Sequence, residues 1–284
     1  MRICFLKVTV RGEPTVFIQR RQDNQEEQQL RAELQRALRQ GLEFHDYPGK
    51  DKLRAFLLNR QGHRCAYCER RINDKRRTSK KSQADTRRAP TNKIEHFHPQ
   101  SSVTASDECR AAAGCNELHE SSLELTNLLA VCAGQTDFAG VVSRHCDTSK
   151  ANTDICAQLK NPNTAEQRDP SAPELGSLVV VERDGTVRPN PAYFPGEEEM
   201  KAAQDVLNDV LNLNAIWLKE ARAKLYALLT RGLVSAIKEQ SRKHHNVSRR
   251  QLRQKIVRAR LKTLETKAPE FPSVYLSFCV ENSQ

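Results

Sequence analysis

The sequence contains no long apolar run. Its longest apolar stretches, such as Leu-Ala-Val-Cys-Ala at 129–133, are far shorter than the roughly 20 residues that span a bilayer. The N-terminal residues also lack the basic, apolar and small-residue order of a signal peptide. We therefore expect a cytoplasmic protein that is neither secreted nor inserted in a membrane.

Disulfides are not expected either, because thiols stay reduced in the cytosol. The chain nevertheless has nine cysteines, which in that compartment indicate metal binding or reactive thiols. A length of 284 residues suits one large domain or two small ones.

The charge of the chain is strongly unbalanced. Lys and Arg number 46 against 35 Asp and Glu, which gives a net charge of +11 and a pI near 9.3. The apolar share of 38% and mean hydropathy of −0.70 are polar for a globular protein, but helix-forming polar residues account for much of this. A basic excess is typical of proteins that bind a polyanion, most commonly nucleic acid. A merely soluble basic protein is the alternative.

Periodicity predicts mainly helix with two short β pieces. We expect a β-rich segment at 3–10, helices at 25–40 and 52–59, and a hairpin with its turn at Asp184-Gly185. A long amphipathic helix is predicted from Glu197 to about Leu233, and another from an N-cap at Ser248 to about Lys267. Four regions follow: an N-terminal β and helical segment (1–52), a central region (53–155), a linker with the hairpin (156–195) and a helical C-terminal region (196–284).

Two segments have more than one interpretation. The basic insertion from Asn73 to Asn92 has no apolar periodicity, so it is either a solvated loop or a loop that contacts phosphates. The apolar stripe of the helix at 197–233 is typical of a core face, but a partner-binding face is the alternative.

Cysteines in the central region predict a zinc site. Cys65 and Cys68 lie on a short turn that can direct both sulfurs at one ion, although a redox pair has the same spacing. No βαβ frame of the thioredoxin kind accompanies them, which favours zinc. Cys132 and Cys146 are the preferred second pair because they bracket the loop after Asn127. The competing ligands are Cys109, Cys115 and His145.

Glu95-His96 is the most informative dipeptide. Hydrolysis of a phosphodiester needs a base for water and a divalent ion for the developing charge. A carboxylate is a hard ligand for such an ion, and an imidazole is a base near neutral pH. Three polar residues follow this dipeptide in the chain: Asn127, Asp147 and Lys150. Each alone would be an ordinary turn or surface residue, and only their order after Glu95-His96 makes them candidates for a site.

The order Cys-Ala-Tyr-Cys at 65–68, Ile-Glu-His-Phe-His-Pro at 94–99, Asn-Leu-Leu-Ala-Val-Cys at 127–132 and Cys-Asp-Thr-Ser-Lys at 146–150 resembles the HNH endonucleases. It is particularly similar to the HNH subunit of Septu-type antiphage systems, the PtuB-like proteins also found with some retrons. The stretch at 210–222 resembles the tail helix of that group. The resemblance covers about two thirds of the chain, and it implies an α+β fold. That fold has a zinc-stapled ββα-metal core at 53–155, an N-terminal helical segment and a mainly helical C-terminal region.

The resemblance also implies roles for single residues. Glu95 and Asp147 would be ligands of a catalytic magnesium or another divalent cation, and His96 the general base. Asn127 would hold the loop geometry, and Lys150 would face the substrate phosphate. A structural zinc would be bound by Cys65, Cys68, Cys132 and Cys146.

The chain departs from the family pattern at two positions. The second cysteine pair is usually Cys-x-x-Cys, whereas thirteen residues separate Cys132 from Cys146 here. Asp147 stands where the family has His or Asn, and the role of His98 is open.

The partners that the resemblance implies are nucleic acid (DNA or tRNA), an ABC-type ATPase subunit that is PtuA-like, and for retrons a reverse transcriptase with its msDNA. A small ββα core could not cover all apolar residues of 197–233, which also favours a protein partner. The alternative function is a non-catalytic zinc-ribbon subunit that binds nucleic acid or another protein.

Overall fold

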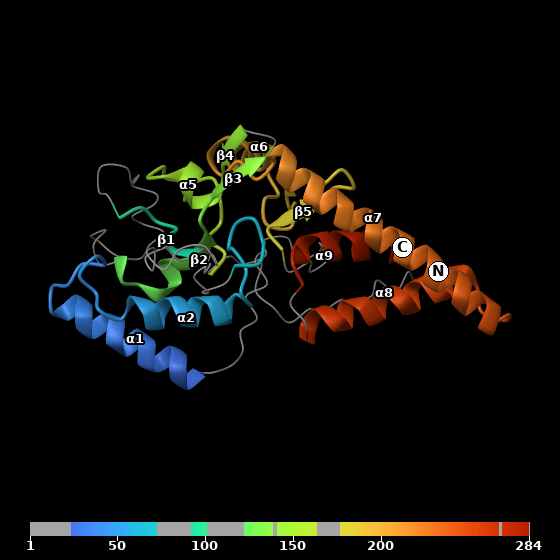
Figure 1. Cartoon of the computed structure of the whole chain (residues 1–284), viewed down its shortest axis with the longest axis horizontal. Helices are drawn as coiled ribbons and strands as arrows, with labels where there is room; N and C mark the ends of the chain where they lie inside the picture. The colour runs from blue at the N-terminus through green and yellow to red at the C-terminus, as the bar shows by residue number, and fades with distance from the viewer. Residues whose placement is uncertain are drawn as a thin grey trace, which may run out of the picture.

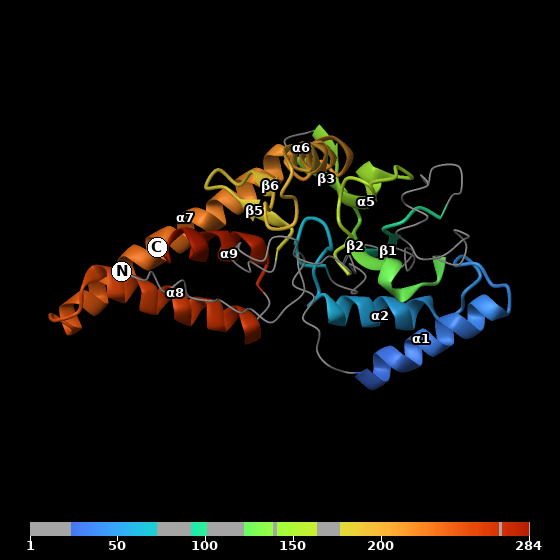
Figure 2. The same cartoon turned by 180° about the vertical axis from the view of Figure 1, so that it is seen from behind.

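The computed structural model describes residues 24–72, 92–100, 122–138, 141–163, 177–266 and 269–283 (Figure 1 and, from behind, Figure 2). The β-rich segment predicted at 3–10, nearly all of the basic insertion, and the competing ligands Cys109 and Cys115 lie outside these residues. Among the described helices, none combines the length and the apolar character needed to cross a membrane.

Two helices form the N-terminal part of the fold and confirm the two predicted there. α1 (Asn24–Arg39) buries Leu30 and Leu34 against α2 (Lys50–Arg60), which buries Leu53 and Leu57 in turn. The spacing of these leucines puts them on one face of each helix. α2 then lies along β2 (Leu128–Cys132), with α1 on its far side (Figure 1).

A two-stranded antiparallel sheet and a short helix form the centre of the molecule. β1 (Asn92–His96) pairs with β2, with Glu95 opposite Leu129 and His96 opposite Leu128. The 3₁₀ turn η1 (Leu125–Asn127) precedes β2, and α5 (Cys146–Lys150) follows it. Between β2 and α5 lies a second antiparallel pair, β3 (Gln135–Phe138) and β4 (Val141–Arg144), which the sequence did not predict.

β2 is the buried strand of this sheet. All five of its residues are buried, as expected for the apolar sequence Leu-Leu-Ala-Val-Cys. The Gln61 side chain bonds both backbone groups of Ala130, at 2.7 Å each, and the Ala66 N–H also donates to the Ala130 carbonyl. These bonds hold the turn at 65–68 against β2.

The C-terminal region consists of a hairpin and a group of helices. β5 (Val179–Val181) and β6 (Val187–Pro189) form the hairpin that the sequence predicts around Asp184-Gly185. Ser248 does cap a helix, since its Oγ accepts from the Gln251 N–H and the Gln251 side chain accepts from the Ser248 N–H. The helices are α6 (Glu197–Asp205), the π-helical turn η2 (Val206–Val210), α7 (Ile216–Lys243), α8 (Arg249–Thr266) and α9 (Pro272–Glu281).

The prediction of one continuous helix from Glu197 to Leu233 is wrong. The chain leaves the helix at 211–215 because tertiary hydrogen bonds replace helical ones there. The Leu211 carbonyl accepts from the Cys146 N–H at 2.8 Å, and the Asn214 side chain bonds the backbone of Val187. α7 then continues ten residues beyond the predicted end.

The apolar residues of 197–233 are mostly covered by the chain itself. Val206, Leu207, Leu211, Trp217 and Leu218 are all buried. They therefore give no support for a protein partner, because the hairpin, α5 and α9 pack against these helices. α9 was not predicted, since its residues are apolar on several sides and give no amphipathic period.

The C-terminal segment also packs directly against the cysteine turn. The Glu69 carboxylate accepts from the Ser273 N–H at 3.0 Å and from the Ser273 hydroxyl, while the Phe271 N–H donates to the Glu69 carbonyl. The Arg64 guanidinium donates to the Pro269 carbonyl at 2.9 Å. The central and C-terminal regions are thus joined at the turn that carries Cys65 and Cys68.

Candidate metal centre and candidate active site

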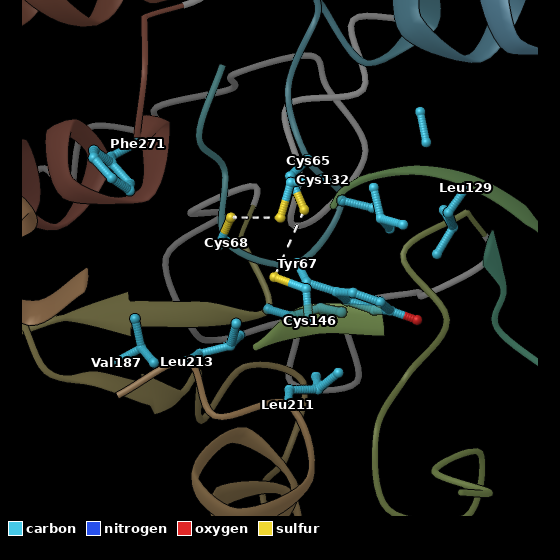
Figure 3. Close-up of a cluster of buried hydrophobic side chains, with 14 of the residues drawn as sticks. Cys65, Tyr67, Cys68, Leu129, Cys132, Cys146, Val187, Leu211, Leu213 and Phe271 are labelled. Carbon is cyan, nitrogen blue, oxygen red and sulfur yellow. Dashed lines mark hydrogen bonds between the residues drawn. The ribbon is translucent and has the colours of Figure 1, made fainter. Parts of the chain in front are cut away.

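Four buried cysteines gather at the junction of the sheet, α5 and the C-terminal region. Figure 3 shows the sulfurs of Cys65, Cys68, Cys132 and Cys146 facing one another. Their Sγ atoms all lie within 4.8 Å of one another. The Cys65–Cys146 sulfurs are 3.8 Å apart and the Cys68–Cys132 sulfurs 3.9 Å.

These distances suit a tetrahedral zinc ion. A Zn–S bond of about 2.3 Å gives a tetrahedron whose S···S edges are about 3.8 Å. Burial raises the pKa of the Cys68 and Cys146 thiols, whereas hydrogen bonds from Cys146 and the other thiols lower that of Cys132. Four thiolates so close together need a cation to offset their repulsion. The four cysteines could therefore hold a structural metal such as zinc, as the preferred pairing of the sequence predicts.

Three different elements bring these cysteines together. Cys65 and Cys68 come from the turn bound to Ala130, Cys132 ends β2, and Cys146 begins α5. Cys146 has a φ of +54°, a left-handed conformation that is costly for a residue with a Cβ. A hydrogen bond from the Cys146 N–H to the Leu211 carbonyl helps to hold it there.

His145 lies beside the cluster rather than within the group of four. Its Nε2 is 3.4 Å from the Cys132 sulfur, and its ring stacks edge-on against Trp217, with centroids 4.8 Å apart. An imidazole N–H directed at a metal-bound thiolate would stabilise its charge.

The carboxyl groups of Glu95 and Asp147 are close enough to shift each other's pKa. The Lys150 ammonium lies 2.9 Å from Oε1 of Glu95. Burial and the neighbouring Asp147 raise the pKa of Glu95 to about 8. Burial opposes ionisation of Asp147 as well, but hydrogen bonds with Glu95 and Lys93 outweigh it and lower the pKa. Two carboxyl groups this close together form a partial site for a hard divalent cation.

Lys150 lies deeper than expected for a residue that faces a phosphate. Its side chain is 2% exposed, and its ammonium is bound by the Glu95 carboxylate and lies 3.3 Å from the His96 carbonyl. Its contact with a substrate phosphate stays a prediction.

His96 ends β1 with its imidazole buried and held at both nitrogens. Nε2 lies 2.8 Å from the Ser122 carbonyl, which can only accept, so this nitrogen carries the proton. The other nitrogen, Nδ1, then has the lone pair and accepts from the Gln100 amide at 2.9 Å. Burial lowers the pKa of His96 to about 4, so the ring is neutral at neutral pH.

Asn127 holds the chain just after His96. Its Oδ1 accepts from the His98 N–H at 2.6 Å, and its Nδ2 donates to the His98 carbonyl at 3.2 Å. The Phe97 N–H donates to the Asn127 backbone carbonyl at 3.0 Å. These three bonds define the path of the chain out of β1.

Two residues of this neighbourhood were not singled out from the sequence. Tyr67, between the first two cysteines, donates from its hydroxyl to the Glu95 carboxylate at 3.2 Å. The Cys156 sulfur lies 2.9 Å from Nδ1 of His98. His98, whose role the sequence left open, therefore belongs to a thiol–imidazole pair. Spacing gave no signal for either, although the position of Tyr67 inside the cysteine turn makes its closeness to the cluster unavoidable.

Comparisons with family models, with curated proteins and with solved structures found no match for this chain. The chemistry of the site therefore rests on its own residues. They form a buried cluster of four thiols beside a pair of carboxyl groups, a buried ammonium and a neutral imidazole.

Proposed function

We propose that this chain is a metal-dependent HNH endonuclease that hydrolyses phosphodiester bonds, with DNA favoured and tRNA or other RNA possible. The observation that carries the proposal is the placement of Glu95-His96 at the end of β1, beside Asn127 before β2 and Asp147 on α5. These elements follow one another in the β-β-α order of a ββα-metal core, with the additional pair β3–β4 between β2 and α5.

His96 is the general base in this proposal. Its Nε2 donates to the Ser122 carbonyl, so Nδ1 is the atom that would take the proton of the attacking water, which must displace the Gln100 amide from Nδ1 to reach it. The new bond joins the water oxygen to phosphorus, and the bond to the leaving ester oxygen breaks. Because the ring is neutral at neutral pH, the base is in its active form there.

Glu95 and Asp147 would hold the catalytic cation. A bound Mg²⁺ would stabilise negative charge on the phosphate and on the leaving oxygen. Tyr67 and Lys150 hold the Glu95 carboxylate from two sides. Asn127 keeps the turn after His96 in place, and zinc at the four cysteines would support the fold without taking part in the chemistry.

The protein partners of the chain are also part of this proposal. We propose that the nuclease is the effector subunit of an antiphage complex with an ABC-type ATPase, a PtuA-like protein, and in a retron with a reverse transcriptase and its msDNA. These partners rest on the resemblance in the motifs. In such a complex the isolated chain would cleave slowly until the ATPase activates it.

The test is cleavage by the purified chain, alone and together with its genomic neighbours. Labelled duplex DNA and total tRNA are incubated with Mg²⁺ or with EDTA, beside His96→Ala. We expect products that need both Mg²⁺ and His96. Binding without cleavage under every condition would instead support the non-catalytic zinc-ribbon alternative.

A further inference from the structure

One described segment of the chain has a large excess of basic residues. Residues 231–260, which we call the cationic arm, contain ten Lys or Arg and a single acid, Glu239. The arm therefore carries +9 of the net +11, in about a tenth of the chain. Glu239 is itself paired with Lys243 at 2.6 Å.

The structure places these charges on the outside of a helical hairpin. The second half of α7 packs against α8, and the apolar residues Leu233, Leu252 and Val257 are buried between the helices. Arg260 is directed inward and donates to the Leu229 carbonyl at 3.1 Å. The other nine are exposed: Arg231, Lys238, Arg242, Lys243, Arg249, Arg250, Arg253, Lys255 and Arg258.

α7 begins near the candidate site, and the cationic arm starts fifteen residues, or about 22 Å, further along this helix. Trp217, in the first turn of α7, stacks on His145, the residue before the candidate metal ligand Cys146. From there α7 runs for 28 residues, about 42 Å at 1.5 Å per residue. Both views show α7 and α8 projecting together from the rest of the molecule (Figures 1 and 2). A DNA duplex of that length has about 12 base pairs at 3.4 Å each.

We propose that the cationic arm binds the phosphate backbone of the DNA duplex that flanks the cleavage site. The proposal rests on the proposed nuclease function and adds where the substrate is held. Charge complementarity favours a polyanion over a protein partner, because the core of a protein interface is depleted in charged residues and built around buried aromatic and apolar anchors. The large apolar side chains that the arm exposes are only Val234 and Val247 among the described residues.

The test compares two triple variants of the full-length chain. Arg249→Gln, Arg250→Gln and Arg253→Gln change the arm, and Arg36→Gln, Arg39→Gln and Lys201→Gln remove the same charge from exposed sites on α1 and α6. Binding to a 30-base-pair labelled duplex is measured in EDTA over a range of salt concentrations. Circular dichroism melting verifies that both variants are folded.

We expect the slope of log K against log salt to fall by about 2.7 for the arm variant, at about 0.9 per phosphate contact. The control variant should keep the wild-type slope. A fall no larger than that of the control would overturn the proposal and assign the arm to a protein partner or to solvent.

Cleavage separates this proposal from the one on which it rests. If wild type cleaves the duplex but the arm variant has the control's salt slope and kcat/KM, the arm proposal fails and the nuclease stands. If the slope depends on the arm but no condition gives cleavage, the nuclease proposal fails and the arm stands. On a ten-base-pair duplex we expect the difference in kcat/KM between the two variants to shrink, because little DNA extends along the arm.

Discussion

The hydroxyl of Tyr67 donates a hydrogen bond to Oε1 of Glu95 at 3.2 Å. Tyr67 lies between Cys65 and Cys68, so one short turn contributes two candidate metal ligands and holds a candidate catalytic carboxylate. Burial raises the pKa of Tyr67, and the phenol therefore stays a donor over the working pH range. The cysteine cluster and the carboxylate pair are thus coupled through a side chain that belongs to neither.

Replacing Tyr67 by Phe should affect cleavage more than folding. The ring keeps its packing, while a hydrogen bond to a carboxylate contributes about 1.5–3 kcal/mol. We expect kcat/KM to fall roughly tenfold or more, with zinc content unchanged. Tyr226→Phe is the matched control, since it removes a similar bond to Glu281 far from the site. Equal kcat/KM in the two variants would show that Tyr67 only fills space.

Cys65→Ser should remove zinc and unfold the centre of the protein. Structural zinc contributes on the order of 10–16 kcal/mol to the folding of small metal domains. We expect the variant to be insoluble, or to lack zinc by elemental analysis and melt at a lower temperature. Cys279→Ser is the control, because Cys279 is fully buried on α9, outside the cluster. A Cys65→Ser protein that retains its zinc contradicts the assignment of the ligands.

His96→Ala should separate catalysis from zinc binding. Its ring contacts Ser122, Gln100 and Phe44 but none of the four cysteines. We expect normal zinc content and a rate of cleavage reduced by about 10²–10⁴, as for loss of a general base. His45→Ala, at an exposed histidine on the surface, is the control. Wild-type cleavage by His96→Ala would remove this residue from the mechanism.

Cation binding at Glu95 and Asp147 should release a proton. The pKa of Glu95 is raised to about 8 by burial and by Asp147, so at pH 7 this carboxyl is mostly protonated without a cation. A divalent cation must displace that proton. Its affinity should therefore rise by up to about tenfold per pH unit below pH 8 and level off above.

Calorimetry with Mn²⁺ in two buffers of different ionisation enthalpy measures the released proton. Close to one proton per ion is expected at pH 7 for wild type. Glu95→Ala and Asp147→Ala should bind the ion weakly and lose cleavage while keeping zinc. Tight binding of Mn²⁺ with no proton released at pH 7 would contradict the assignment of the cation to Glu95 and Asp147.

Local patterns in the sequence were sufficient to predict several elements of the fold and the cysteine cluster. Leucines at helical spacing predicted α1 and α2, and the turn at Asp184-Gly185 predicted the hairpin. The two cysteine pairs were chosen from spacing and motif order, and the structure brings those four sulfurs together. Such features depend on residues close in the chain, or on side chains whose chemistry allows few alternatives.

Tertiary structure alone decided the rest. The break at 211–215 depends on Cys146, more than sixty residues earlier, whose N–H the Leu211 carbonyl accepts. The raised pKa of Glu95 and the lowered pKa of His96 come from burial, which no dipeptide motif specifies. The sequence by itself determined which chemical groups are present and that α1 and α2 form, because both depend on local composition and periodicity. Only the folded chain decided that Tyr67, Asp147 and Lys150 meet at Glu95, because their contacts join residues that lie 28 or more positions apart along the chain.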